Sequence, residues 1–330
     1  MAQKRTVLVT GGGGFLGGAI VRQLVANGEK VRSFSRSRYP SLDGLGVEQM
    51  QGDLCAQADV VQACQGVEAV FHVAAKAGIW GPYKDFYESN VTGTRNILEA
   101  CRRCGVQRLI YTSSPSVVFD GKDMEGVDES VPYPPAYDAH YPRTKALAEQ
   151  MALQAATPGF SVLALRPHLI WGPGDNHLVP GIIRRARRLR RVGDGSNKVD
   201  TIYIDNAAHA HVLAEASLKT KPSLSGKVYF ISQDAPIKLW EMIDRILSAG
   251  GKPPVTKTIS PGAAYLFGAV FERLYGLLRL KSDPPMTRFM AKELATSHWF
   301  DIGAARTDLG YAPIVSTQEG LRRLAQWLRG

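Results

Sequence analysis

The sequence predicts an α/β fold, in which a doubly wound parallel sheet is followed by a smaller, mostly helical C-terminal region. Short apolar runs alternate with segments of helical periodicity through the first half of the chain, which is the pattern of βαβ units. These runs are apolar along their whole length, as expected of strands that helices cover on both faces. A glycine-rich turn joins the first run to the first helix.

The glycine-rich turn contains glycines at a regular spacing of three: Gly11, Gly14 and Gly17. An apolar strand over 5–9 precedes the turn, and a helix ending at Gly28 and a strand over 30–34 follow it. Glycine permits the tight turn, and backbone N–H groups at the start of a helix can approach a pyrophosphate. This context predicts a Rossmann-type dinucleotide site. A glycine-rich loop without a ligand is the alternative.

Further strands and helices follow in alternation. The strands are predicted at 46–52, 68–74, 107–112 and 160–165, the helices between them at 56–64, 83–104 and 142–156, and a proline- and acid-rich loop at 119–138. After Pro167 strands become sparse, and helices are predicted at 179–191, 205–219, 237–249, 262–279, 286–295 and 317–329. We therefore expect a dinucleotide-binding Rossmann domain at 1–167, with return segments near 205–232, and a partly interleaved substrate-binding domain at 168–330.

The composition is that of an ordinary globular protein, with 330 residues of which 45% are hydrophobic and 21% charged. The N-terminus runs directly into the first strand, so no signal peptide is expected. The nearest approach to an apolar span, 263–280, is interrupted by Glu272 and Arg273. Four cysteines argue against a disulfide framework, and the Cys101-x-x-Cys104 pair has no second pair to complete a metal site. A cytoplasmic protein without a metal is therefore expected.

The net charge is +10, and six arginines fall between Arg184 and Arg191. Such a run favours a nucleic acid, an anionic membrane surface or an acidic partner, or it is the solvated face of a helix. No aromatic residues are interleaved with these arginines, so nucleic acid is not expected. The arginine run leaves open that this cytoplasmic protein binds peripherally to a membrane, or that it contacts partner enzymes.

Tyr141 and Lys145 lie four residues apart at the start of a predicted helix, so their side chains share one face. Ser114 follows the fifth predicted strand. The pKa of tyrosine is ordinarily near ~10, and a nearby ammonium favours the phenolate and lowers that pKa toward working pH. A serine hydroxyl can hold a carbonyl oxygen beside the phenol. These residues predict a catalytic site that acts on a carbonyl group. A surface tyrosine and a solvated lysine are the alternative.

Eight motifs occur in order along the chain: Thr10-Gly-Gly-Gly-Gly14-Phe-Leu-Gly17, Gly52-Asp53-Leu54, Phe71-His-Val-Ala-Ala75, Asn90-Val-Thr-Gly93-Thr-Arg-Asn96, Tyr111-Thr-Ser-Ser114, Tyr141-x-x-x-Lys145, Arg166-Pro167-x-x-x-x-Gly172-Pro-Gly-Asp175 and Tyr203-x-Asp205-Asn206. On these motifs the chain resembles the extended short-chain dehydrogenase/reductases over essentially its whole length. Within them it looks like the 3β-hydroxysteroid dehydrogenase group. It is similar to the bacterial 2-alkyl-3-oxoalkanoate reductases of olefin biosynthesis at Ala74-Ala-Lys76-Ala-Gly-Ile-Trp80-Gly81, Ile170-Trp-Gly-Pro-Gly-Asp175, Gly193-Asp-Gly-Ser-Asn-Lys-Val-Asp200 and Pro284-Pro-Met-Thr-Arg288.

The resemblance implies roles for the matching residues. Tyr141 would be the general acid that protonates the reduced carbonyl oxygen, Lys145 would lower its pKa and bind the nicotinamide ribose, and Ser114 would orient the carbonyl. The implied cofactor contacts are Gly11, Gly14, Phe15 and Leu16 in the turn, Asp53 and Leu54 beside the adenine, Ala74 and Ala75 in the cleft, Tyr141 and Lys145, and Pro167 near the nicotinamide. Asn90 would serve a water-linked proton path or the local geometry, or is a packing residue. Related enzymes are often homodimers through paired helices, here 83–104 and 142–156.

The end of the second strand reads Ser35-Arg36-Ser37-Arg38, where an NAD-binding site would place an acidic residue for the ribose 2′-hydroxyl. No carboxylate is present to repel a 2′-phosphate, and guanidinium groups are available to pair with one. We therefore expect NADP(H) in preference to NAD(H), with Arg36 as the main phosphate contact and Ser35 assisting. The alternative is that both arginines are solvated and NAD is accepted.

The substrate is less well determined. The predicted helix at 262–279 carries more apolar surface than one core-facing stripe needs, which suggests the wall of a long apolar pocket, a contact with a membrane or partner, or ordinary core with a dimer contact. Candidate cations for a substrate carboxylate are Lys76, His140 and His168. His72 lies within an apolar strand and is expected to be a core residue, and no metal-site spacing is found at His209 and His211.

These observations favour an NADPH-dependent reductase of a ketone with a long or bulky apolar body, and the resemblance points to a 2-alkyl-3-oxoalkanoic acid that becomes the 3-hydroxy acid. A 3β-hydroxysteroid or sterol dehydrogenase is the first alternative. A nucleotide-sugar epimerase suits the basic charge but not the apolar helix. A non-catalytic dinucleotide-binding sensor would not need Ser114, Tyr141 and Lys145.

Overall fold

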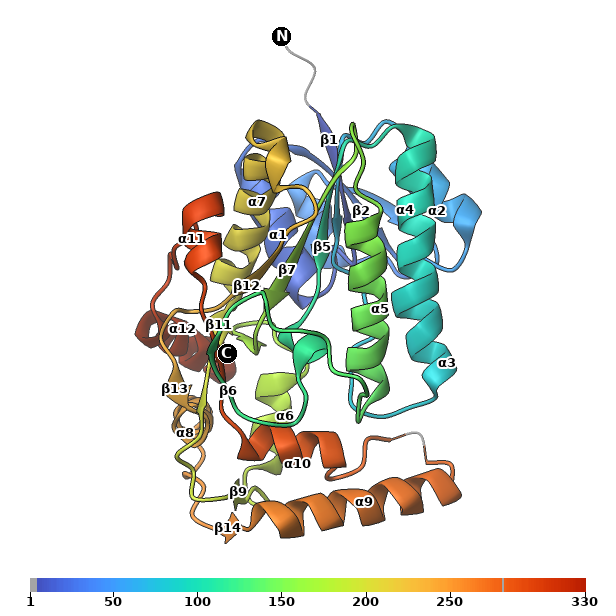
Figure 1. The fold of residues 1–330 in the computed structure, drawn as a ribbon. Helices are drawn as coiled ribbons and strands as arrows, with labels where there is room; N and C mark the ends of the chain where they lie inside the picture. Colours follow the sequence, from blue (N-terminus) through green and yellow to red (C-terminus); the bar gives the residue numbers. More distant parts are fainter. Residues whose placement is uncertain (1–4, 281) are drawn as a thin grey trace.

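A seven-stranded parallel sheet forms the centre of the computed structural model, which describes residues 5–280 and 282–330 (Figure 1). The strand order is β12 (Val228–Ile231), β7 (Ser161–Pro167), β5 (Arg108–Thr112), β4 (Ala69–His72), β1 (Thr6–Thr10), β2 (Lys30–Ser35) and β3 (Glu48–Gln51). The order reverses between β1 and β4, and in sheets of this kind ligands bind at the carboxyl ends of the strands beside such a reversal.

Helices cover both faces of this sheet, as Figure 1 shows. One face carries α1 (Phe15–Ala26) and α7 (Ile204–Thr220), and the other carries α2 (Gln57–Cys64), α4 (Gly93–Cys104) and α5 (His140–Gln154). Side chains alternate between the faces along each strand. Val7 and Val9 of β1 therefore pack with the α1 side, while Leu8 packs with the α2 side. The fold class predicted from the sequence, a doubly wound parallel sheet, is confirmed.

The C-terminal part holds short strands as well as helices. A second sheet has the order β13 (Ile237–Lys238), β10 (Lys198–Val199), β15 (His298–Phe300) and β6 (Met124–Val127), and two further pairs join β8 (Ile170–Trp171) to β11 (Ile202–Tyr203) and β9 (Arg191–Val192) to β14 (Thr258–Ile259). The helices are α6 (Leu178–Arg185), α8 (Leu239–Ala249), α9 (Pro261–Leu277), α10 (Arg288–Ala295), α11 (Gly303–Leu309) and α12 (Thr317–Arg329). Short 3₁₀ turns occur at Pro40–Leu45, Pro115–Val118 and Pro222–Leu224.

Three sequence predictions need correction. The helix expected at 179–191 ends at Arg185, because the chain then turns so that Arg191 pairs with Thr258 between β9 and β14. The arginine run is therefore not one helix face. The loop expected at 119–138 contains β6, whose partner β15 lies far along the sequence. The helix expected at 83–104 consists of α3 (Tyr83–Phe86), a π-helical turn (Tyr87–Thr92) and α4.

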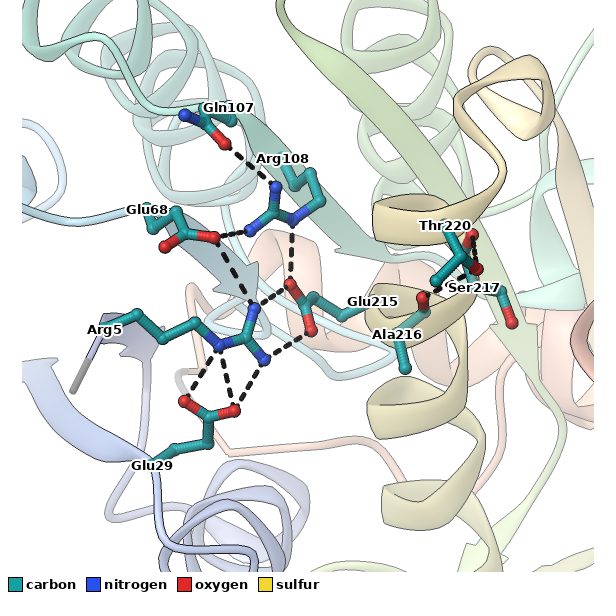
Figure 2. A network of polar contacts seen from close by, with 9 residues as sticks. All are labelled: Arg5, Glu29, Glu68, Gln107, Arg108, Glu215, Ala216, Ser217 and Thr220. Atoms are coloured by element: carbon teal, nitrogen blue, oxygen red, sulfur yellow. Dashed lines mark hydrogen bonds and ion pairs between the residues drawn. The ribbon is translucent and has the colours of Figure 1, made fainter. Parts of the chain in front are cut away.

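An ion-pair network fixes the amino ends of the central strands (Figure 2). Arg5 pairs with Glu29 and with Glu215 of α7 at 2.6 Å each, and Arg108 at the start of β5 pairs with Glu215 at 2.8 Å and with Glu68. Burial opposes ionisation of Glu215, but the two guanidinium groups hold its pKa below the usual value. Because this end of the sheet is closed by charge pairs, the opposite, carboxyl end is the one available for a site.

Strand β12 belongs to the main sheet although it follows Pro167 in the sequence. The division into domains at residue 167 stays a prediction. Within the two described stretches, none of the helices is both long enough and apolar enough to cross a bilayer.

Candidate active site

The glycine-rich turn lies at the carboxyl end of β1, beside the reversal of strand order. Gly11 has a left-handed backbone (φ 68°), and its N–H donates to the carbonyl of Phe34 at 2.8 Å. A side chain on Gly17 would bring its Cβ to 2.1 Å from the carbonyl oxygen of Gly11. Helix α1 starts at Phe15, and its N-cap residue is the exposed Gly14. Because glycine has no side chain, it cannot accept a hydrogen bond from the first N–H groups of the helix. The first N–H groups of α1, including those of Phe15 and Leu16, are therefore directed at this turn.

The ends of β2 and β3 lie beside one another at the same edge. Ser35 is opposite Gln51 in the register, and the N–H of Gly52 donates to the carbonyl of Ser35 at 3.1 Å. Among the described residues the hydroxyl of Ser35 is buried without a hydrogen-bond partner. Arg36 is exposed, whereas Arg38 pairs with Asp43 at 2.9 Å. Of the two arginines, Arg36 is therefore the one that forms no ion pair with a described carboxylate.

The remaining predicted cofactor contacts surround the same edge. Asp53 is exposed, and its carboxylate accepts a hydrogen bond from the N–H of Cys55 at 2.8 Å. The carbonyl of Leu54 accepts from Asn96 at 2.8 Å. Ala74 follows β4 and lies so near Gly11 that a Cβ there would come within 3.1 Å of the Ala74 Cα, and Ala75 is exposed next to it. The structure therefore brings the predicted residues of the turn and of β2, β3 and β4 to one edge.

A buried chain of hydrogen bonds joins β1, β4 and α4. The Oγ1 of Thr10 accepts from the N–H groups of Val73 and Ala74 at 3.1 Å each and lies 2.9 Å from the Nδ1 of His72. The Nε2 of His72 lies 3.0 Å from the Oγ1 of Thr94, whose hydroxyl donates to a main-chain carbonyl. His72 must therefore carry its proton on Nε2. Burial lowers the pKa of His72 to about 3, so it is a neutral core residue, as the sequence suggested.

Tyr141, Ser114 and Lys145 meet at the carboxyl end of β5. Ser114 follows β5, and its hydroxyl accepts from the N–H and the hydroxyl of Ser116 at 3.3 and 3.0 Å. Tyr141 lies in the first turn of α5, near enough to Ser114 for that hydroxyl to affect its pKa. Lys145, one turn later, is almost completely buried. Its Nζ donates to the carbonyl of Thr112 at 2.5 Å and lies 4.2 Å from the centre of the Tyr111 ring. The start of α5 therefore supplies a phenol and a buried amine one turn apart, beside the hydroxyl of Ser114 that follows β5.

The charge states differ from the simple sequence argument, in which the ammonium lowers the pKa of Tyr141. Burial raises the pKa of Tyr141, and the neighbouring Ser114 hydroxyl acts in the opposite direction. Burial also lowers the pKa of Lys145 to about 7, against the raising effect of Glu149. Tyr141 is therefore protonated near neutral pH, which is the form that can donate a proton to a carbonyl oxygen.

Asn90 connects the loop after β4 to helix α5. Its Oδ1 accepts from the N–H of Lys76 at 2.7 Å, and its Nδ2 donates to the carbonyl of Lys76 at 3.1 Å and to the hydroxyl of Thr144 at 3.0 Å. Asn90 lies in the π-helical turn, where the widened backbone directs it inward. Thr144 is the residue before Lys145. Asn90 thus holds the helix of Tyr141 against the cofactor edge.

The three candidate cations have different surroundings. His168 is buried, with its Nε2 2.6 Å from the Nδ1 of His298, and its pKa is lowered well below the usual value by burial and then by His298. It is not available to a substrate carboxylate. His140 precedes Tyr141, with its ring 5.3 Å from that of Tyr83. Lys76 is half-exposed, 3.7 Å from Asp85.

The sequence reasoning missed a buried ion pair beneath the site. Arg166 of β7 donates to Glu149 of α5 at 2.6 and 2.9 Å, and the hydroxyl of Tyr133 donates to the same carboxylate at 2.6 Å. Glu149 lies one turn beyond Lys145, and a buried acid at that spacing was the available signal. Pro167 follows Arg166 at the carboxyl end of β7 and is buried. This pair holds α5 and β7 together below the reacting groups.

The site fits a nicotinamide dinucleotide. Glycines occupy the positions where a Cβ would collide, and the first N–H groups of α1 face the turn. The Ser35 hydroxyl, which has no partner in the part of the chain that the structure describes, precedes Arg36 in the sequence. Among residues 5–280 and 282–330, no group of three or more His, Cys, Asp or Glu side chains is arranged to hold a metal. The arrangement can therefore hold a redox cofactor and donate a proton.

Comparisons with known proteins agree with this site. The model of the 3-beta hydroxysteroid dehydrogenase/isomerase family matches residues 8–258. A 2-alkyl-3-oxoalkanoate reductase of Stenotrophomonas maltophilia is 52% identical over 96% of this chain and 98% of its own length. A decarboxylating sterol-4-alpha-carboxylate 3-dehydrogenase of Mus musculus is 35% identical over 98% and 91%. The solved structure of MoeE5 with UDP-glucuronic acid and NAD is 26% identical, with a TM-score of 0.76 over 98% of this chain and 99% of MoeE5.

Proposed function

The chain belongs to the 3-beta hydroxysteroid dehydrogenase/isomerase family, and we propose that it reduces the ketone of a 2-alkyl-3-oxoalkanoic acid to the 3-hydroxy acid. The observation that supports a reductase is Tyr141, which burial keeps protonated beside Ser114, one helical turn from the buried amine of Lys145. The substrate class comes from the relative that is 52% identical over nearly the whole length of both chains.

In this mechanism the residues of the chain position the ketone and supply a proton, and the bound nicotinamide supplies the hydride. Ser114 donates a hydrogen bond to the carbonyl oxygen. As that oxygen gains negative charge, the hydroxyl of Tyr141 donates its proton to it, so that the C=O group becomes CH–OH. Lys145, fixed by the carbonyl of Thr112, stabilises the phenolate that Tyr141 becomes. Asn90 binds both Lys76 and Thr144, so it fixes the spacing between the loop after β4 and helix α5.

Tyr141→Phe tests the proton donor. The variant keeps the ring and lacks the hydroxyl, so we expect kcat for ketone reduction to fall by ~10²- to 10⁴-fold. The affinity for the dinucleotide, measured by quenching of protein fluorescence, should change little. Turnover that persists in this variant with normal cofactor binding would refute the assignment of Tyr141.

We further propose that NADPH is preferred over NADH, with Arg36 and the hydroxyl of Ser35 binding the 2′-phosphate. Arg36 is exposed and directly follows Ser35, whose buried hydroxyl has no hydrogen-bond partner among the described residues, whereas Arg38 is already paired with Asp43. A hydrogen bond to a charged group contributes ~1.5–3 kcal/mol. Arg36→Ala should therefore lower the ratio of kcat/KM for NADPH to that for NADH by about 10- to 100-fold. Arg38→Ala is the matched control and should change the ratio much less. The proposal is contradicted if the native chain prefers NADH and the Arg36→Ala variant keeps that preference.

A second candidate is oxidation of a 3β-hydroxysteroid or sterol, and the mouse relative at 35% identity favours it. A screen of NADPH oxidation with a 2-alkyl-3-oxo acid, a 3-ketosteroid and a nucleotide sugar separates the candidates. We expect the 2-alkyl-3-oxo acid to give the highest kcat/KM. Lys76 is the candidate cation for its carboxylate, because burial and then Arg143 lower the pKa of His140. The homodimer through 83–104 and 142–156 and the cytoplasmic location stay predictions.

A further inference from the structure

Helix α9 exposes a continuous apolar face. The exposed fractions reach 82% for Leu277 and 65% for Leu266, and a contiguous exposed apolar patch of this kind marks an interaction site. The α9 face, as we use the name, consists of Leu266, Phe267, Val270, Leu274, Leu277 and Leu278. These residues recur every three to four positions, so they project from one side of the helix. At 1.5 Å per residue, the 17 residues of α9 give a ridge of about 26 Å.

The other side of α9 already packs against the protein. Ala264 and Gly268 are buried, and a Cβ on Gly268 would lie 2.5 Å from the backbone of Thr287 at the start of α10. Figure 1 shows α9 as an outermost helix at the lower edge of the molecule, with α10 above it. The α9 face points away from this contact by the helical periodicity. It is therefore additional to the core of the chain and needs another explanation.

Basic residues lie near the first turn of α9 and on α9 itself. The exposed Arg187, Arg188 and Arg190 lie just before β9, and the N–H of Arg191 donates to the carbonyl of Lys257 at 2.8 Å, four residues before α9 begins. Arg273 lies on α9 itself and is exposed. The acid of α9, Glu272, is paired with Arg288 at 2.6 Å. Exposed guanidinium groups thus lie near the first turn of α9 and on the helix itself, and the acid of α9 is paired.

A cavity opens beside the same helix. It has a volume of about 640 Å³ and lies between α9 and the loop that follows β4, lined by Trp80, Leu266, Ala269, Glu272, Arg273 and Arg288. The indole N–H of Trp80 donates to the carbonyl of Leu280 at 3.2 Å. The lining combines apolar side chains with the paired Glu272 and Arg288 and with the guanidinium of Arg273, which fits an amphiphile whose anionic head lies at Arg273.

We propose that the α9 face docks on an anionic lipid bilayer, with the helix lying in the plane of the interface. Apolar side chains on one side of a helix and arginines beside it are the combination that binds such surfaces. A second copy of this chain fits less well, because pairing two α9 faces would bring two sets of arginines together. The proposal concerns a surface outside the catalytic site and does not depend on the substrate proposed above.

Co-sedimentation with vesicles tests the proposal. The full chain should bind vesicles that contain about one third phosphatidylglycerol at least about tenfold more strongly than vesicles of phosphatidylcholine alone. Leu274→Ser/Leu277→Ser should lower binding by at least about tenfold, because two leucines that insert into the bilayer are lost. Arg187→Gln/Arg188→Gln should lower binding several-fold and flatten its dependence on salt between about 0.1 and 1 M.

Ile314→Ser is the matched control, since Ile314 is 58% exposed but belongs to a different part of the fold. It should leave vesicle binding unchanged, and thermal unfolding should show that all variants fold. The proposal is overturned if anionic vesicles are not bound, or if Leu274→Ser/Leu277→Ser binds them as well as the native chain does. It is also overturned if this variant converts a dimer into a monomer in sedimentation velocity without a change in vesicle binding, because a second copy then covers the face.

Discussion

The buried pair of Glu149 and Arg166 gives a prediction that connects stability with catalysis. The two side chains are 0% and 2% exposed and share two hydrogen bonds of 2.6 and 2.9 Å, and Tyr133 adds a third bond to the carboxylate at 2.6 Å. Glu149→Gln keeps the shape of the side chain but removes its charge. It also turns an amide N–H₂ group toward a guanidinium or phenol donor.

The expected loss of stability follows from these contacts. Removing one partner of a buried pair leaves an uncompensated charge and costs ~3–5 kcal/mol. Because the glutamine oxygen can keep one bond to Arg166, we expect the lower part of that range, about 3 kcal/mol. Urea unfolding at neutral pH, followed by tryptophan fluorescence, should show a lower midpoint with an unchanged slope.

A double variant serves as the control for this interpretation. Glu149→Met/Arg166→Met removes both charges and should be within about 1–2 kcal/mol of the native chain, hence more stable than Glu149→Gln alone. A loss below about 1 kcal/mol in Glu149→Gln would refute the claim that this pair is buried and mutually dependent.

The same substitution has a catalytic readout. Glu149 raises the pKa of Lys145, while burial lowers it to about 7. Without the carboxylate, the pKa of Lys145 should fall further, so the limb of the pH–rate profile that reports Lys145 should move to lower pH. A merely structural role for Glu149 would lower the amount of active protein without moving that limb.

Two further predictions concern the cofactor turn and the response to acid. Gly17→Ala places a Cβ at 2.1 Å from a carbonyl oxygen of the turn, so the backbone must shift. We expect an unfolding free energy lower by ~1–3 kcal/mol and a dinucleotide Kd raised at least about tenfold. Gly44→Ala is the control and should show neither change, because its Cβ meets no atom within 4 Å. Gly28→Ala is a poorer control, because Gly28 has a positive φ that strains an alanine. His211 accepts from Thr112 and is buried, and burial lowers its pKa from 6.5 to about 4. Between these values the unfolded chain binds a proton that the folded chain does not, so stability falls as pH falls through this window. His211→Gln should reduce the loss between about pH 7 and pH 5 by ~2 kcal/mol, and equal losses in both proteins would contradict the argument.

The sequence by itself determined the features that depend on local periodicity. Strands of the central sheet form continuous apolar runs, and the glycine spacing reports backbone positions where a Cβ does not fit, as the contact of Gly17 with Gly11 shows. The four-residue separation of Tyr141 and Lys145 places both on one helical face regardless of what surrounds them. Ser114 was found because it follows a strand that the pattern identified.

The tertiary structure alone decided everything that depends on partners far apart in the sequence. Strands of two to four residues, such as β6 with its partner β15, are too short to show a period, and their pairing depends on segments more than a hundred residues away. The arginine run leaves its helix for the same reason, since Arg191 pairs with Thr258. Glu149 and Arg166 could be recognised as an ion pair only once α5 lay on β7.

Burial is the second property that no local pattern contains. The sequence placed an ammonium beside Tyr141 and concluded that its pKa falls, but enclosure by the folded chain raises that pKa and lowers the pKa of Lys145. The helix at 262–279 was seen to carry surplus apolar residues, yet periodicity gives only their direction around the helix axis. Which side is covered depends on where α10 packs, and that contact leaves the α9 face in solvent.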